Sequence, residues 1–177
     1  MMDWSERLLS TSDGIDEAYS LPEQVAALYR QQESTWPGLR AGLEALGEAE
    51  TRQLDVRHGQ VVLQHNPQRL VSTGAKVDTS TIKHRPCFLC SANMPPEEKG
   101  VDFLGRYLIL CNPFPILPEH LVIAEREHTP QRLDGRELEL ITLARFLGPN
   151  YVVLYNGPAC GASAPTMPTT TRPAMVR

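Results

Sequence analysis

The stretch RYLILCNPFPILPEHLVIA, residues 106–124, decides the fold of this chain. Its two apolar runs, Arg106–Cys111 and Leu121–Ala124, are short enough to be buried strands. Three prolines lie between the runs and exclude a helix there. The stretch therefore predicts two strands that are joined by a rigid loop.

Asn112 and His120 stand at the two ends of this proline-rich loop. A rigid loop presents such side chains at fixed positions, which suits a ligand that has to be oriented before it reacts. The alternative interpretation is a structural crossover in which His120 only forms a hydrogen bond. The loop by itself leaves both interpretations open.

Helical and extended patterns alternate along the rest of the chain. Apolar residues recur at helical spacing from Leu21 to Leu46 and predict two helices with a break at Pro37. Residues 54–63 hold two β-prone runs around a glycine-containing turn, which predicts a hairpin. A further strand is expected at residues 151–155.

A third helix is expected from about Arg136 to Leu147, because Gly148-Pro149-Asn150 stops the helical pattern there. Four of its apolar residues are expected to form the inner face, namely Leu138, Ile141, Leu143 and Leu147. These elements together predict an α+β fold with a largely antiparallel sheet and flanking helices.

The patterns divide the chain into a helical segment over residues 1–50, a domain over 51–165 and a tail over 166–177. The tail is rich in Thr and Pro and has no apolar periodicity, so we expect it to be disordered. The sheet would then stop at Tyr155 with an unpaired edge and an uncovered apolar face. We therefore expect marginal stability.

The composition excludes several classes of protein. With 177 residues, 41% hydrophobic and 21% charged, the chain suits one ordinary globular domain. A net charge of −4 argues against a protein that coats nucleic acid. No stretch approaches the roughly 18 apolar residues of a membrane span, and the first residues do not resemble a signal peptide. We expect a cytoplasmic protein with no nucleic-acid or membrane partner.

Cys87-Phe88-Leu89-Cys90 is a candidate metal clip. Two thiolates at this spacing can both reach one Zn²⁺ at about 2.3 Å. The pair supplies half of a tetrahedral site, and four residues are candidates for the remainder: His84, His120, His128 and Cys160. A redox pair and two buried structural thiols are the alternatives.

A loop rich in small residues, YNGPACGASAP at 155–165, directly follows the last expected strand. Small residues let backbone N–H groups approach an anion, and Asn156 and Ser163 can add hydrogen bonds to phosphate oxygens. An ordinary glycine-rich turn is the alternative.

In this order, the C-x-x-C pair, the strand–proline loop–strand stretch and Asn-Gly-x-x-x-Gly-Ala-Ser resemble a branch of the histidine-triad-like superfamily. This branch contains the galactose-1-phosphate uridylyltransferases and the diadenosine-tetraphosphate phosphorylases, which are ATP adenylyltransferases. The resemblance covers about residues 52–165. It implies a zinc pair at Cys87 and Cys90. It also implies a nucleotide-binding set that consists of Asn112, His120, Asn156, Gly161 and Ser163.

The nucleophile of that family is missing from this chain. The family carries H-x-H-x-Q or H-x-H-x-H on the strand after the Gly-Ser loop, and the second histidine attacks the α-phosphorus of a nucleotide. This chain has no histidine after His128. The resemblance thus implies a parent nucleotidyltransferase or nucleotide phosphorylase that uses a nucleoside di- or polyphosphate or a nucleotide sugar. The resemblance also implies phosphate or a sugar phosphate as the acceptor, and we expect this chain to be an incomplete, inactive form.

The genetic code suggests a cause for the missing motif. In a shifted reading frame, the third base of each codon from Pro165 onward is read together with the first two bases of the next codon. The codons read in this way at positions 166–171 can encode Asp-His-Ala-His-x-His. We hypothesise that a one-base frameshift replaced the catalytic strand. The alternative is a natural tail on a non-catalytic nucleotide- or zinc-binding module. Both hypotheses are compatible with a homo-oligomer.

Overall fold

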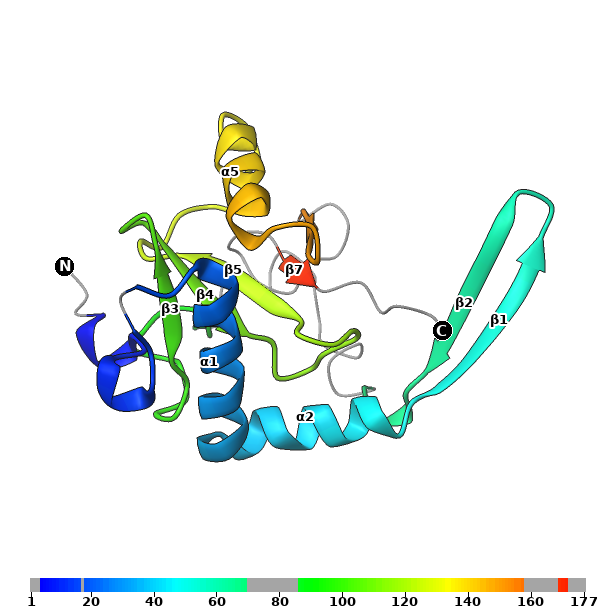
Figure 1. Cartoon of the computed structure of the whole chain (residues 1–177), viewed down its shortest axis with the longest axis horizontal. Coiled ribbons are helices and arrows are strands. Elements are labelled where there is room, and N and C mark those ends of the chain that lie inside the picture. Colours follow the sequence, from blue (N-terminus) through cyan, green and yellow to red (C-terminus); the bar gives the residue numbers. More distant parts are fainter. Residues whose placement is uncertain (1–3, 17, 70–85, 158–168, 172–177) are drawn as a thin grey trace.

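The computed structural model describes residues 4–16, 18–69, 86–157 and 169–171 (Figure 1). In chain order the elements are the short 3₁₀ turns η1 (Ser5–Arg7) and η2 (Thr11–Asp13), α1 (Leu21–Thr35), α2 (Pro37–Gly47), β1 (Glu50–Val56), β2 (Gly59–His65), η3 (Pro67–Arg69), β3 (Gly100–Phe103), β4 (Tyr107–Cys111), β5 (Leu121–Glu125), α5 (Glu137–Leu147), β6 (Val152–Leu154) and β7 (Thr169–Thr171). The α+β class with antiparallel sheets is confirmed.

The main sheet has the strand order β3-β4-β5-β7-β6, and every neighbouring pair is antiparallel. The two strands expected in residues 106–124 are observed as β4 and β5, which pair from Tyr107↔Glu125 to Cys111↔Leu121. All five residues of β4 are buried. The sheet is therefore covered on both faces at this strand.

Different segments cover the two faces of β4. Side chains alternate along a strand, so Tyr107, Ile109 and Cys111 point to one face and Leu108 and Leu110 to the other. The first three pack with buried residues of α1, α2 and α5. The other two pack with a cluster that includes Trp4, Leu89 and Met94. One face thus has helices, and the other has the N-terminal segment and the cysteine loop.

The two N-terminal helices confirm the predicted break at Pro37. The Ser20 and Glu23 side chains form a capping box that begins α1. Pro37 has no N–H to continue α1, but it suits the first position of α2. Val25 and Leu28 are fully buried against the sheet. The break lets α2 leave the sheet at an angle (Figure 1).

The prediction of the inner face of the third helix is right for two of its four residues and wrong for the other two. Leu143 and Leu147 of α5 are buried, but Leu138 is 77% exposed and Ile141 is 55% exposed. At roughly 100° per residue, Leu138 and Ile141 lie opposite to Leu143 and Leu147 on a helix. Leu140 packs against the same core cluster as Leu143 and Leu147, so this side of α5 is its inner face.

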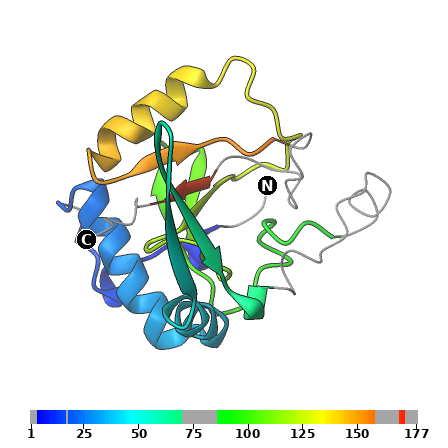
Figure 2. The same cartoon turned by 90° about the vertical axis from the view of Figure 1, so that its right-hand side faces the viewer.

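The predicted hairpin is confirmed as β1 and β2, which extend beyond α2 and away from the main sheet (Figures 1 and 2). Its register pairs Leu54 with Val61 and Val56 with Gly59. Alternation therefore gathers its larger apolar side chains, except Val62, on one face: Leu54, Val56, Val61 and Leu63. All four are 42–50% exposed.

The tail differs from the expectation at Thr169–Thr171. These residues form β7, which pairs with β5 through Leu121↔Thr170 and with β6 through Val153↔Thr170. The prediction that the sheet ends at Tyr155 is thus wrong. A further strand, β7, follows in the chain and lies between β5 and β6, so that β6 is the edge strand. Thr has a high β propensity, but a three-residue strand owes its place to partners far away in sequence. In the part of the chain that the structure describes, no helix has the length and apolar character needed to cross a membrane.

Candidate functional site

Three metal-ligating side chains meet on the face of the sheet that the helices do not cover. The ligand atoms of Cys87, Cys90 and His128 all lie within 4.8 Å of one another, and Cys90 Sγ is 3.2 Å from His128 Nδ1. Cys87 is buried, Cys90 is half-buried and His128 is exposed. This cluster could hold a metal ion.

Local hydrogen bonds shape the loop that carries the two cysteines. The Cys90 N–H donates to the Cys87 carbonyl at 3.1 Å, and the Asn93 and Met94 N–H groups donate to the Cys90 carbonyl at 2.8 and 3.2 Å. The Asn93 amide also donates to the Cys87 carbonyl at 2.9 Å. These bonds close a tight turn that brings both sulfur atoms to one side.

Burial affects the cysteine pair as well. The low-polarity surroundings, and secondly the neighbouring Cys87 thiol, raise the pKa of Cys90 to about 11. A bound cation would reverse this preference, because thiols bind metals as thiolates. Without a metal, Cys90 therefore favours its protonated, uncharged form.

The structure selects among the four residues that the sequence offered as further ligands. His128 joins the cysteine pair, whereas His120 is not part of the cluster. His84 and Cys160 lie outside the described residues. The sequence supplied His128 only as one of several candidates, because its contact with Cys90 spans 38 positions.

Asn112 and His120 lie close together where the proline-rich loop begins and ends. His120 is buried, and its Nε2 lies 3.4 Å from Asn112 Nδ2. The Ile116 N–H donates to His120 Nδ1 at 3.3 Å, and the Phe114 N–H donates to Asn112 Oδ1 at 2.9 Å. Backbone groups of the loop thus orient both side chains.

Two tyrosines that the sequence did not single out hold the end of this loop. The Tyr29 hydroxyl of α1 donates to the His120 carbonyl at 2.7 Å, and the Tyr151 hydroxyl donates to the Glu119 carboxylate. Burial, more than the nearby charges, raises the pKa of Tyr29, so its hydroxyl stays a donor. Glu119 has a φ of 50°, a left-handed conformation that non-glycine residues rarely adopt. Its contact with Tyr151 helps to hold that conformation.

The predicted phosphate-binding residues are only partly described. Gly161 and Ser163 lie outside the described residues, and the side chain of Asn156 is exposed. Gln131 donates from Nε2 to the Asn156 carbonyl at 2.6 Å, and Gln131 Oε1 is buried without a hydrogen-bond partner among the described residues.

Sequence reasoning missed an ion-pair network around the buried carboxylate of Glu125. The side chain of Glu125 is 3% exposed and contacts Arg106 at 3.0 Å and Arg136 at 2.5 Å. It also accepts a hydrogen bond from the Thr129 hydroxyl. No local pattern could reveal this network, since its members come from β5 and from segments on both sides of it.

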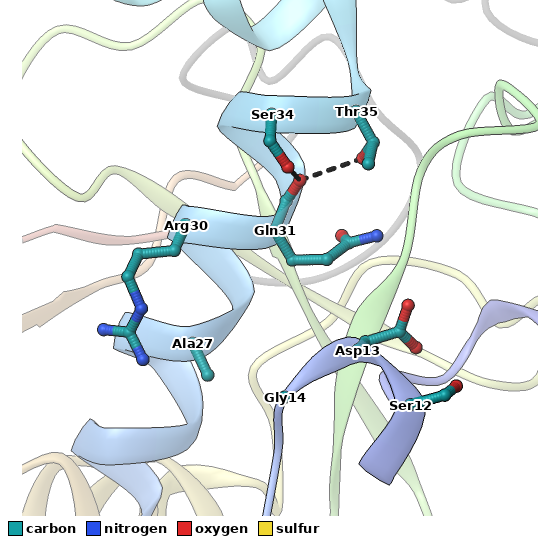
Figure 3. A pocket seen from close by; sticks show the side chains of 8 residues that line it. All are labelled: Ser12, Asp13, Gly14, Ala27, Arg30, Gln31, Ser34 and Thr35. Atoms are coloured by element: carbon teal, nitrogen blue, oxygen red, sulfur yellow. Dashed lines mark hydrogen bonds between the residues drawn. The ribbon is translucent and has the colours of Figure 1, made fainter.

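A shallow hollow of about 440 Å³ lies between η2 and α1 and contains none of the predicted site residues (Figure 3). Its polar groups are largely satisfied within the chain. Ser34 and Thr35 donate to the Gln31 carbonyl, and Asp13 forms an ion pair with Lys99 at 2.7 Å. The hollow therefore offers few unpaired groups to a ligand.

Comparison with known proteins identifies a family but no characterised relative. No curated protein and no solved structure matches the chain. A family model described as a domain of unknown function, DUF4922, matches residues 28–168. This range includes α2, the strands β3 to β6 and the three residues that could hold a metal ion, Cys87, Cys90 and His128. The chain therefore belongs to the DUF4922 family.

Proposed function

We propose that the parent of this chain is a nucleotidyltransferase or nucleotide phosphorylase of the histidine-triad-like kind, and that the chain itself lacks the nucleophilic histidine. The observation that carries the proposal is the position of β7. The segment that follows the glycine-rich loop forms a strand between β5 and β6. The resembling family has its histidine motif on the strand after that loop.

The register of β7 supports this proposal. Position 169 pairs with Val122 of β5 and Leu154 of β6, and position 170 pairs with Leu121, the residue after His120. The shifted reading allows histidines at positions 167, 169 and 171. Alternate positions of a strand point to one face, so imidazoles at positions 169 and 171 would share a face; position 167 lies outside the described residues. Position 169 corresponds to the second histidine of the motif.

The proposed reaction has two displacements at the α-phosphorus. The imidazole of the parent attacks that phosphorus and breaks its bond to the bridging oxygen, which leaves with the distal phosphate or sugar phosphate. An oxygen of the acceptor, phosphate or a sugar phosphate, then displaces the imidazole. In this proposal Asn112 and His120 orient the nucleoside. The loop with Asn156, Gly161 and Ser163 binds the phosphates through backbone N–H groups.

Zinc is the metal that we propose for Cys87, Cys90 and His128. Two sulfur atoms and one imidazole nitrogen form a donor set that zinc accepts, and separations within 4.8 Å suit ligands at about 2.0–2.3 Å from one centre. The parent strand would supply the fourth ligand. When bound, the metal would stabilise the cysteine loop. A cytoplasmic location belongs to this proposal, because reducing conditions keep such a thiol pair free.

The decisive experiment compares this chain with a frame-corrected protein that carries a histidine at position 169. Each is mixed with nucleoside triphosphates and nucleotide sugars labelled at the α-phosphate, and the acid-quenched protein is tested for a covalent adduct. We expect an adduct only for the corrected protein, and none when its position 169 is changed to alanine. Absence of an adduct from the corrected protein, or an in-frame gene in independent isolates, would contradict the proposal.

A second candidate, a non-catalytic nucleotide- or metal-binding module, is favoured by one observation. The three metal-ligating residues meet within this chain, and β7 completes a continuous sheet. Titration calorimetry with nucleoside phosphates and metal analysis of the purified chain would separate the two candidates. Nucleotide binding by a stable, monodisperse chain supports the module, whereas aggregation without binding supports a broken enzyme.

A further inference from the structure

Arg7 is surrounded by carbonyl groups of the loop that carries Cys87 and Cys90. One terminal nitrogen of its guanidinium donates to the Pro95 carbonyl at 2.5 Å and to the Pro96 carbonyl at 3.2 Å. The other donates to the Ser91 carbonyl at 3.2 Å and to the Met94 carbonyl at 3.3 Å. These partners lie 84–89 positions away in the sequence.

The segment that contains Arg7 is itself fixed to the main sheet. The Leu9 N–H donates to the Gly100 carbonyl of β3 at 2.8 Å, and Leu8 forms a parallel bridge with Gly100. Trp4 is 7% exposed and belongs to the same buried cluster as Cys87. Residues 4–9 therefore connect the edge of the sheet to the cysteine loop. They lie before the range that the family model matches.

A guanidinium suits this loop for a physical reason. Residues 91–96 form no helix or strand, so their carbonyls have no regular ladder of backbone partners, although the Pro95 carbonyl also accepts from the Glu98 N–H at 3.1 Å. A guanidinium presents five N–H donors in a fixed planar fork, which allows one side chain to satisfy several carbonyls at once. A lysine ammonium has three donors around one point and cannot reach carbonyls spread as widely.

We propose that Arg7 is a positioning residue of the metal centre, and that the N-terminal segment completes this centre by holding the cysteine loop in its metal-binding conformation. The inference rests on the metal site of the proposed function. Without Arg7, more of the binding free energy has to order the loop, so metal affinity falls. Coupling of this kind is reciprocal, and a bound metal should in turn stabilise the attachment of residues 4–9.

Cobalt provides the test, because Co²⁺ bound to thiolates has charge-transfer absorption that reports both affinity and sulfur ligation. We would titrate the full chain and three variants with Co²⁺ and displace it with Zn²⁺. Arg7→Ala should raise the Kd about 10- to 100-fold, the range typical of groups that orient metal ligands. Arg7→Lys should recover part of this loss.

Arg40→Ala is the matched control. Arg40 also donates to two carbonyls, those of Glu33 at 3.1 Å and Ser34 at 2.9 Å, but it joins the ends of α1 and α2 instead of the cysteine loop. Its loss should leave the Kd within about twofold of the parent value, since it removes similar bonds elsewhere. An equal effect of Arg40→Ala and Arg7→Ala would overturn the inference.

A measurement on the unmodified chain covers the case in which Arg7→Ala does not fold. Zn²⁺ should slow hydrogen exchange at the Leu9 amide, which is bonded to Gly100. Unchanged exchange under saturating metal would overturn the role of the N-terminal segment. An unchanged Kd in Arg7→Ala would overturn the role of Arg7 while the metal site stands, whereas no Co²⁺ binding by the unmodified chain would overturn the metal site as well.

Discussion

Glu98 is a buried carboxyl group close to Arg7 and Cys111. It is 6% exposed, and burial raises its pKa to about 8, although the charge of Arg7 opposes this shift. The carboxyl also contributes, after burial, to the raised pKa of the Cys111 thiol. A residue of this kind makes the stability of the fold depend on pH.

The direction of that dependence follows from proton binding. The pKa of Glu98 is about 8 in the folded chain and 4.5 for an ordinary glutamate, so between these values the folded state binds more protons. Stability should therefore fall as pH rises from about 4.5 to 8, by on the order of a few kcal/mol. Glu98→Gln should remove most of this slope in urea unfolding measured at several pH values. Parallel pH profiles for both proteins would contradict the prediction.

His128 offers a second test at the scale of one residue. It is exposed, so His128→Ala should change the stability of the metal-free chain by less than about 0.5 kcal/mol. The rise in Tm that saturating Zn²⁺ produces should fall sharply, because that rise follows the metal Kd. His58→Ala, at the exposed hairpin turn, is the control and should keep the full rise. Equal shifts in both variants would argue against His128 as a ligand.

Among the elements, α5 shows most clearly the difference between what a local sequence pattern predicts and what tertiary contacts decide. All four leucines and isoleucines expected on its inner face look equivalent in the sequence, but only Leu143 and Leu147 are buried. The hydrophobic spacing was sufficient to predict a helix at these residues. It could not decide which side of the helix meets the core, because that side is set by contacts with residues far away in the sequence.

Two substitutions in α5 test this assignment. Leu143→Ala removes a side chain that is 1% exposed and should cost about 2–5 kcal/mol of unfolding free energy. Leu138→Ala removes one that is 77% exposed and should change stability by less than about 0.5 kcal/mol. Chemical denaturation of both variants gives the comparison. Similar losses would mean that α5 packs through a wider face than the structure has.

At the scale of the whole molecule, β7 connects the two parts of the main sheet. It is the only described strand that pairs with both β5 and β6. Thr170→Pro should therefore separate β6 and α5 from the rest of the sheet, because proline cannot continue a ladder in an interior strand. The lost ladder hydrogen bond leaves its acceptor without a partner, so we expect a loss of about 1–3 kcal/mol or more in unfolding free energy. Thr170→Ala keeps the backbone and is the control; a proline variant as stable as the alanine one would exclude a paired β7.

The sequence by itself determined the elements that depend on near neighbours. Proline positions and apolar spacing predicted β4, the rigid loop, β5, the break at Pro37 and the hairpin. The spacing of Cys87 and Cys90 predicted two members of the cluster that could hold a metal ion, and the ends of the proline-rich loop singled out Asn112 and His120 as candidates. These elements can be predicted because turns, strands and helix ends are controlled by residues within a few positions in the sequence.

Only the tertiary structure decided which distant residues meet. Packing on both faces of β4 brings His128 to the cysteines, Arg7 to the cysteine loop and Tyr29 to the carbonyl of His120. Pairing on both sides gives Thr169–Thr171 a strand conformation, although the Thr- and Pro-rich composition of residues 166–177 had indicated disorder. Such contacts depend on burial and hydrogen-bond satisfaction across the whole fold, and no local stretch of the chain determines either property.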